Sequence, residues 1–164
     1  MKKQIDAERL QKIHLVAFDV DGVFTDGRFS LSDDAIESKV FNTQDGFGIR
    51  RLIDSGYEVA VISGRKSKAV RLRMEELGIK HVVLGCSNKV AAFDRLLDQL
   101  GLDRTQGAYT GDDVPDLELL QHAGLAFGVA NSMPEIHVAC DYITCAEGGK
   151  GAVREICDLF CQDL

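Results

Sequence analysis

Several features that would assign this chain to a class of protein are missing from its sequence. No CxxC pair occurs among the five cysteines, and the four histidines lack metal-ligand spacing, so no zinc site is expected. The N-terminal residues hold no apolar run typical of a secretory signal, and nothing approaches the ~20 apolar residues that span a bilayer. We therefore expect a cytoplasmic protein with reduced thiols and no membrane partner. Cys157 and Cys161, four residues apart on a predicted helix, are expected to serve packing.

The chain also has no excess of positive charge. It carries 19 Lys and Arg against 26 Asp and Glu, a net charge of −7. Non-specific nucleic-acid binding needs clustered basic residues, so no nucleic-acid partner is expected. An anionic small substrate is still compatible with this charge, because a local cation overrides the net value. No repeat, low-complexity stretch or Pro-rich linker occurs, and 164 residues predict a single domain over 1–164.

Short apolar runs alternate with helix-period segments along most of the chain. Strands are predicted at 13–18, 59–62, 82–84, 108–110, 126–129 and 142–144, and helices at 46–55, 67–77, 89–100, 116–122, 134–139 and 152–160. This alternation predicts an α/β fold, a doubly wound, Rossmann-like parallel sheet with helices on both faces. Residues 28–41 instead alternate apolar and polar residues around a polar turn, which predicts a β-hairpin.

Polar clusters follow four of the predicted strands. They are Asp19-Val20-Asp21, Ser63-Gly64-Arg65, Ser87-Asn88-Lys89 and Gly111-Asp112-Asp113. In parallel sheets ligands bind beyond the carboxyl ends of the strands, so these four segments are expected to converge at one edge.

The residue types in these clusters favour phosphate chemistry. Two aspartates spaced like Asp19 and Asp21, taken alone, most often form an exposed acidic turn. A divalent cation would relieve the repulsion between their carboxylates. Asp112 or Asp113 would then complete a set of hard oxygen ligands suited to Mg²⁺. Taken alone, Ser63 is a helix N-cap and Lys89 a solvated residue. Together with the carboxylates they form a pocket for a phosphoryl group, which Lys89 neutralises and Ser63 holds by hydrogen bonds.

In this order along the chain, the motifs resemble those of the haloacid dehalogenase-like hydrolase superfamily. The family's DxDGxxT motif matches residues 19–25, its Ser motif matches Ser63, its Lys motif matches Lys89 and its GDxxxD motif matches residues 111–116. Across most of the chain, the resemblance narrows to the 3-deoxy-D-manno-octulosonate 8-phosphate phosphatases. That similarity is carried by residues 41–46, 87–89 and 148–155, although the family more often has Arg where this chain has Lys150.

The resemblance implies a role for each motif. Asp19 is expected to be the nucleophile that forms an aspartyl-phosphate, and Asp21 the general acid and base. Mg²⁺ would be held by Asp19, the backbone carbonyl of Asp21 and Asp112. The substrate, a sugar-acid phosphate of lipopolysaccharide precursor synthesis, would meet Ser63, Gly64, Arg65, Lys89 and Lys150. Asp113 and Asp116 would orient the metal site or Lys89, and Thr25 acts either on the turn or directly.

The spacing of the motifs leaves no room for a capping domain. Only 41 residues separate Asp21 from Ser63 and 22 separate Lys89 from Asp112, whereas a separate domain needs about 50 or more. A large substrate or a neighbouring subunit must then exclude water from the site. The hairpin at 28–41 is the candidate lid, the alternative being a simple extension of the sheet. The resemblance implies a homotetramer, and residues from Gly148 onward either serve an active site, in the same or a neighbouring subunit, or merely connect elements.

Three alternatives to this function fit the same residues. The first is a phosphatase of the same class that acts on a nine-carbon sugar-acid phosphate. The second is a non-enzymatic phosphoreceiver domain, and the third is an inactive scaffold that keeps only the fold. A phosphoreceiver is expected to carry its phosphorylated Asp in the middle of the chain rather than after the first strand.

Overall fold

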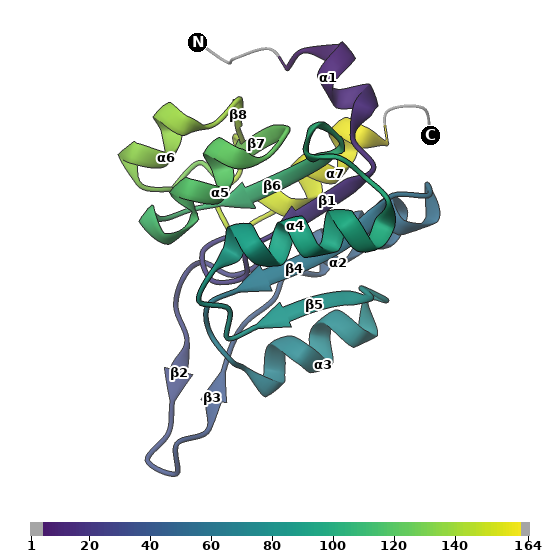
Figure 1. The fold of residues 1–164 in the computed structure, drawn as a ribbon. Coiled ribbons are helices and arrows are strands. Elements are labelled where there is room, and N and C mark those ends of the chain that lie inside the picture. The colour runs from purple at the N-terminus through teal and green to yellow at the C-terminus, as the bar shows by residue number, and fades with distance from the viewer. Residues whose placement is uncertain (1–4, 162–164) are drawn as a thin grey trace.

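The structure, a computed structural model, describes residues 5–161 and has a parallel sheet at its centre (Figure 1). Within these residues the sheet has the strand order β5-β4-β1-β6-β7-β8. Its strands are β1 (Leu15–Phe18), β4 (Glu58–Ser63), β5 (His81–Leu84), β6 (Gly107–Gly111), β7 (Leu125–Gly128) and β8 (Tyr142–Ile143). The predicted α/β parallel sheet is therefore confirmed. The outermost residues of the predicted domain, 1–4 and 162–164, lie outside the described part of the chain.

Strand β1 lies at the centre of the sheet and is buried on both faces. Val16 pairs with Val59 of β4 on one side and with Ala108 of β6 on the other. Side chains alternate across a strand, so Val16 and Phe18 enter one core, whereas Leu15 and Ala17 enter the other. A strand buried in this way reads as a continuous apolar run, which is why the sequence located it.

Helices cover both faces of the sheet. Helices α2 (Thr43–Asp54), α3 (Lys68–Glu76) and α7 (Ala152–Phe160) contribute to one core, and α4 (Lys89–Leu100), α5 (Leu117–His122) and α6 (Pro134–Ala139) to the other. Helix α7 packs on α2 through its amphipathic face, where Val153, Ile156 and Cys157 are buried. Cys161 is also buried, which confirms that this pair of cysteines serves packing.

The predicted hairpin forms a small sheet of its own. Strands β2 (Ser30–Leu31) and β3 (Glu37–Ser38) pair with each other and not with the central sheet, so an extension of that sheet is ruled out. The hairpin projects from the body of the protein (Figure 1), and several of its apolar side chains are exposed: Phe29, Leu31, Ile36 and Val40. We call residues 28–41 the flap. No capping domain is present among the residues that the structure describes.

Three short helical elements were not predicted from the sequence. Helix α1 (Ala7–Lys12) buries none of its residues and is held by an ion pair between Arg9 and Asp141, so it has no apolar periodicity. The 3₁₀ helices η1 (Arg104–Gln106) and η2 (Val114–Asp116) are equally short. Helix α2 begins three residues before the predicted start, because the side chain of Asn42 caps it. Among the described helices, none combines the length and apolarity required to cross a membrane.

Candidate active site

The path of the chain opens a crevice between β1 and β6. From β1 the chain proceeds to β4 and β5, and then α4 leads back to β6 on the other side of β1. Segments that leave two adjacent strands in opposite directions create a binding crevice at the carboxyl end of the sheet. A pocket of about 290 Å³ lies there, lined by Asp19, Asp21, Gly27, Ser63, Gly64, Arg65, Lys89, Asp112, Asp113, Pro115 and Asp116. The four polar clusters thus converge as predicted.

The segment that follows β1, which we call the β1 turn (residues 20–27), is held by its own hydrogen bonds. The backbone carbonyl of Val20 accepts from the N–H groups of Val23 and Phe24 at 3.1 and 2.9 Å. Thr25, only 1% exposed, accepts from the N–H groups of Gly22 and Gly27 at 3.2 Å through its hydroxyl. Of the two roles considered for Thr25, these contacts support stabilisation of the turn.

Lys89 connects the acidic groups at the base of the pocket. Its Nζ lies 3.1 Å from Asp19 Oδ2, 2.6 Å from Asp116 Oδ1 and 3.2 Å from the hydroxyl of Tyr109. That hydroxyl donates in turn to Asp116 Oδ1 at 2.6 Å. The predicted solvated alternative for Lys89 is therefore wrong, since its side chain is nearly buried between two carboxylates. Sequence reasoning did not include Tyr109, because a tyrosine within an apolar strand reads as core.

Asp116 is saturated with hydrogen-bond donors. Its Oδ2 accepts from the backbone N–H groups of Asp112 and Asp113 at 3.0 and 3.3 Å, in addition to the two bonds on Oδ1. Gly111 permits this close approach, because an added β-carbon would lie 2.4 Å from that of Asp116. Asp116 therefore fixes the segment that carries Asp112 and is not itself available as a metal ligand.

Burial and mutual repulsion make the acidic groups difficult to ionise without a cation. The pKa of Asp19 is raised to about 7, chiefly by burial and then by the charge of Asp116, against the opposing effect of Lys89. The pKa of Asp112 is also raised to about 7, by burial and by the neighbouring carboxylates. Burial lowers the pKa of Lys89, but Asp19 and Asp116 outweigh it and keep the amine charged.

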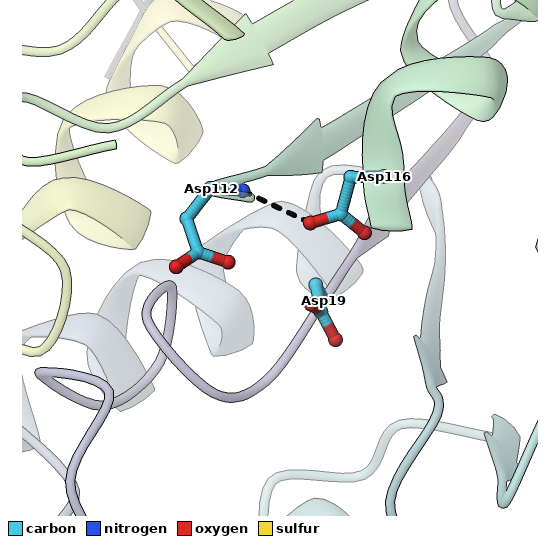
Figure 2. A group of neighbouring side chains, drawn as sticks. All are labelled: Asp19, Asp112 and Asp116. Atoms are coloured by element: carbon cyan, nitrogen blue, oxygen red, sulfur yellow. Dashed lines mark hydrogen bonds between the residues drawn. The ribbon is translucent and has the colours of Figure 1, made fainter. Parts of the chain in front are cut away.

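These carboxylates suit a hard divalent cation. Figure 2 shows Asp19 at the end of β1, near Asp112 and Asp116, and ligand oxygens of the three lie within 4.8 Å of one another. Because Asp116 is saturated, Asp19 and Asp112 are the residues suited to bind Mg²⁺. Gly22 lies against Asp112, since a β-carbon on Gly22 would approach Asp112 Oδ2 to 1.9 Å. The use of the Asp21 carbonyl as a further ligand stays a prediction.

The flap reaches the pocket through charged residues that sequence reasoning missed. The Nζ of Lys39, whose side chain is fully covered, donates to Asp21 Oδ1 and lies 3.3 Å from Glu37 Oε1. On its other oxygen, Glu37 accepts from Arg65 Nε at 2.7 Å, and the Arg65 guanidinium lies 4.1 Å from the centre of the Phe29 ring. The alternation of the hairpin indicated its strands but gave no signal for these contacts.

Ser63 lies buried at the end of β4. Its hydroxyl accepts from the backbone N–H of Arg65 at 3.4 Å, which turns the Ser63–Arg65 segment toward the pocket. On the other side of the pocket, the carboxylate of Asp113 accepts from the N–H of Val114 and caps η2. Asp113 thus shapes the loop that supports the metal site, in keeping with the orienting role expected of it.

Lys150 does not line this pocket. Its side chain is 63% exposed, and its Nζ lies 2.6 Å from Glu147 Oε2. Residues 148–151, which we call the glycine loop, contact the segment that follows β1. A β-carbon on Gly148 would lie 1.8 Å from the carbonyl oxygen of Gly22, so this loop is packed tightly on the β1 turn. A role for Lys150 in a neighbouring subunit stays a prediction.

Comparisons with known proteins agree with this geometry. Residues 85–156 match the family described as haloacid dehalogenase-like hydrolase. The 3-deoxy-D-manno-octulosonate 8-phosphate phosphatase KdsC of Escherichia coli (strain K12) is 44% identical over 151 residues, which cover 92% of this chain and 80% of the relative.

Solved structures are also similar to this chain in both fold and sequence. The phosphatase of the same name from Moraxella catarrhalis, in complex with magnesium ion, phosphate ion and a KDO molecule, has a TM-score of 0.92 and 40% identity, covering 94% of this chain and 89% of that one. The cobalt-bound form of the Haemophilus influenzae phosphatase has a TM-score of 0.90 and 40% identity, covering 94% and 90%.

Proposed function

The chain belongs to the haloacid dehalogenase-like hydrolase family, among its 3-deoxy-D-manno-octulosonate 8-phosphate phosphatases, and we propose that it hydrolyses this sugar-acid phosphate to the free sugar acid and phosphate. It is a phosphoric monoester hydrolase with Mg²⁺ as its cofactor. The observation that carries the proposal is the Asp19 carboxylate at the base of a pocket, held beside Lys89 and next to Asp112.

In the proposed mechanism Asp19 attacks the phosphorus atom and forms an aspartyl-phosphate, which splits one difficult step into two. Its Oδ1 is fixed by the N–H of Val20 at 2.7 Å, so Oδ2 is the attacking oxygen. Lys89, held between Asp19 and Asp116, neutralises charge on the phosphoryl oxygens. The Ser63–Arg65 segment, which also lines the pocket, supplies hydrogen-bond donors to the phosphoryl group.

Asp21 is the proposed general acid and base. It protonates the leaving sugar alkoxide and then takes a proton from the water that hydrolyses the aspartyl-phosphate. The Lys39 amine holds the Asp21 carboxylate in place at the rim of the pocket. Asp19, Asp112 and the carbonyl of Asp21 would hold Mg²⁺, which would offset the negative charge of the transferring group.

We further propose that the enzyme is a cytoplasmic homotetramer that acts in lipopolysaccharide precursor synthesis. Phosphoryl transfer benefits when water is excluded, and the described chain has no capping domain to do so. The exposed apolar side chains of the flap, Leu31, Ile36 and Val40, favour burial against a neighbouring subunit. In such an assembly Lys150 would meet the substrate bound to a neighbouring subunit.

A substrate panel tests the proposed function. Phosphate release is measured with 3-deoxy-D-manno-octulosonate 8-phosphate, a nine-carbon sugar-acid phosphate and nucleoside monophosphates, with and without Mg²⁺. We expect the highest kcat/KM for the octulosonate 8-phosphate, and no phosphate release without Mg²⁺. Equal or better rates on nucleotides contradict the assignment, and preference for the nine-carbon substrate supports that alternative instead.

The nucleophile is tested by Asp19→Asn. The amide is nearly isosteric but does not act as this nucleophile, so a folded variant without turnover is expected. Phosphate release at the wild-type rate by the purified variant would refute the mechanism. Stable phosphorylation of the wild-type chain without turnover would instead indicate a phosphoreceiver.

A further inference from the structure

Two segments that the proposed mechanism does not use meet each other in the structure. Residues 41–46 precede and begin α2, and residues 148–155 include the glycine loop and the start of α7. The Nδ2 of Asn42 donates to the carbonyl oxygen of Gly149 at 3.2 Å. One turn later, Asp45 Oδ1 accepts from the backbone N–H of Arg154 at 2.9 Å. Segments more than a hundred residues apart in the sequence are therefore joined by side-chain contacts to the backbone.

The glycine loop in turn supports the β1 turn. The N–H of Gly149 donates to the carbonyl of Val23 at 3.0 Å. A β-carbon on Gly149 would lie 2.7 Å from the backbone nitrogen of Asp26, and one on Gly148 would clash with the Gly22 carbonyl. Such contacts leave the two backbones no freedom to shift independently. The position of the glycine loop therefore sets the position of the turn that carries Asp21.

Asn42 connects the glycine loop to the end of the flap through a single side chain. Its Oδ1 accepts from the N–H of Gln44 at 2.8 Å and caps α2, while its Nδ2 holds the glycine loop. It follows the flap directly, three residues after Lys39, which contacts Asp21. The catalytic carboxylate is thus held from two sides: by Lys39 at its side chain, and by Asn42 through the loop behind its backbone.

We propose that Asn42 is a positioning residue for the phosphatase reaction, which acts through the glycine loop to place Asp21 for proton transfer to the leaving group. The inference rests on the proposed function of this site. A general acid accelerates departure of a poor leaving group such as a sugar alkoxide, but adds little for a p-nitrophenolate, which leaves without protonation. Loss of the Asn42 amide donor should therefore discriminate between these two classes of ester.

The test uses Asn42→Asp and Asn42→Ser, which both retain an acceptor for the α2 cap. Both lose the bond to Gly149, because aspartate has no donor and the serine hydroxyl is one bond shorter than the asparagine amide. We expect kcat/KM for the octulosonate phosphate to fall about tenfold in both variants, and kcat/KM for p-nitrophenyl phosphate to change less than about threefold. This parameter reports the steps up to departure of the leaving group, so later hydrolysis of the aspartyl-phosphate does not mask the effect.

Matched variants separate positioning from loss of stability. Asn42→Ala removes both the cap and the donor, so it should lower the Tm and reproduce the kinetic effect. Asp6→Ala removes the cap of α1, at the other end of the sheet, and should lower the Tm without changing the ratio of kcat/KM values for the two esters.

Three results overturn the inference: unchanged kinetics in Asn42→Asp and Asn42→Ser, an equal loss on both esters, or a loss in Asn42→Asp alone, which would reflect its added charge. If the wild-type enzyme is inactive on the octulosonate phosphate, the proposed function fails. The inference is then judged on any other alkyl phosphate that the enzyme hydrolyses, so the two failures are distinguishable.

Discussion

Replacing Asp116 with asparagine should destabilise the protein far more than its small change in size suggests. The side chain is 1% exposed and accepts four hydrogen bonds, from Lys89, the hydroxyl of Tyr109 and the backbone N–H groups of Asp112 and Asp113. Asparagine offers one acceptor oxygen and one donor amide in the same space. In either orientation of the amide, two of the four donors lose their acceptor and face another donor.

The magnitude follows from those two donors. Each buried group left without a partner costs about 1–3 kcal/mol, so the free energy of unfolding should fall by about 2–6 kcal/mol. For a chain of this length, 1 kcal/mol corresponds to about 2–4 °C in Tm, so the midpoint should fall by roughly 4–24 °C. The charge of Lys89 is not left unpaired, because Asp19 Oδ2 lies 3.1 Å away, and this keeps the estimate below that for an isolated buried charge.

The assay is urea unfolding in metal-free buffer, with thermal unfolding as a second measurement. Tyr109→Phe is the matched control, because it removes one donor from the same carboxylate and leaves the other three, so it should cost about 1 kcal/mol. An Asp116→Asn protein within about 0.5 kcal/mol of wild type, the range of an ordinary surface substitution, would refute the account of this network.

Other perturbations test the metal site, the C-terminal loop and the α2–α7 contact. Chelation should abolish phosphate release, and added Mg²⁺ should restore it. The pKa values of Asp19 and Asp112 are raised to about 7, so protons compete with Mg²⁺ for these carboxylates. The apparent Mg²⁺ affinity of the enzyme should therefore weaken as the pH falls below 7. Lys150→Ala should raise KM for the octulosonate phosphate, hardly change the kinetics with p-nitrophenyl phosphate, and leave the oligomer size in gel filtration unchanged. If the kinetics with both esters are unchanged, the glycine loop is only a connector. Burial raises the pKa of Asp45 against the opposing backbone N–H groups at the start of α7, so the folded state binds more protons than the unfolded state, and wild-type stability is lost as the pH rises through the folded pKa. Asp45→Asn lacks this slope, so its stability relative to wild type should increase as the pH rises above the ordinary carboxyl pKa of about 4, and a constant difference in urea unfolding would contradict the assignment.

The sequence predicted the sheet and the convergence of the site for a physical reason. Strands buried on both faces are continuous apolar runs, and the carboxyl ends of parallel strands share one edge. Asp19, Ser63, Lys89 and Asp112 each follow such a run, so knowing the strands was enough to bring these side chains together.

What the sequence did not reveal depends on contacts between irregular segments. Lys39 reaches Asp21, and Asn42 reaches Gly149, through side chains whose spacing has no period. Helix α1 has no fully buried residue and so carries no apolar pattern. Gly148 and Gly149 are required because the backbone of the β1 turn passes too close for a β-carbon, which composition alone does not reveal.

The packing of α7 on α2 has a consequence for synthesis of the enzyme on the ribosome. Ile49 and Leu52 of α2 share a core with Val153 and Ile156, which are synthesised more than a hundred residues later. A nascent chain therefore carries an uncovered apolar helix face, a surface prone to aggregation, until α7 has left the exit tunnel. The glycine loop directly precedes α7, so the β1 turn gains its support, and the enzyme its activity, only after that stretch of the chain has emerged.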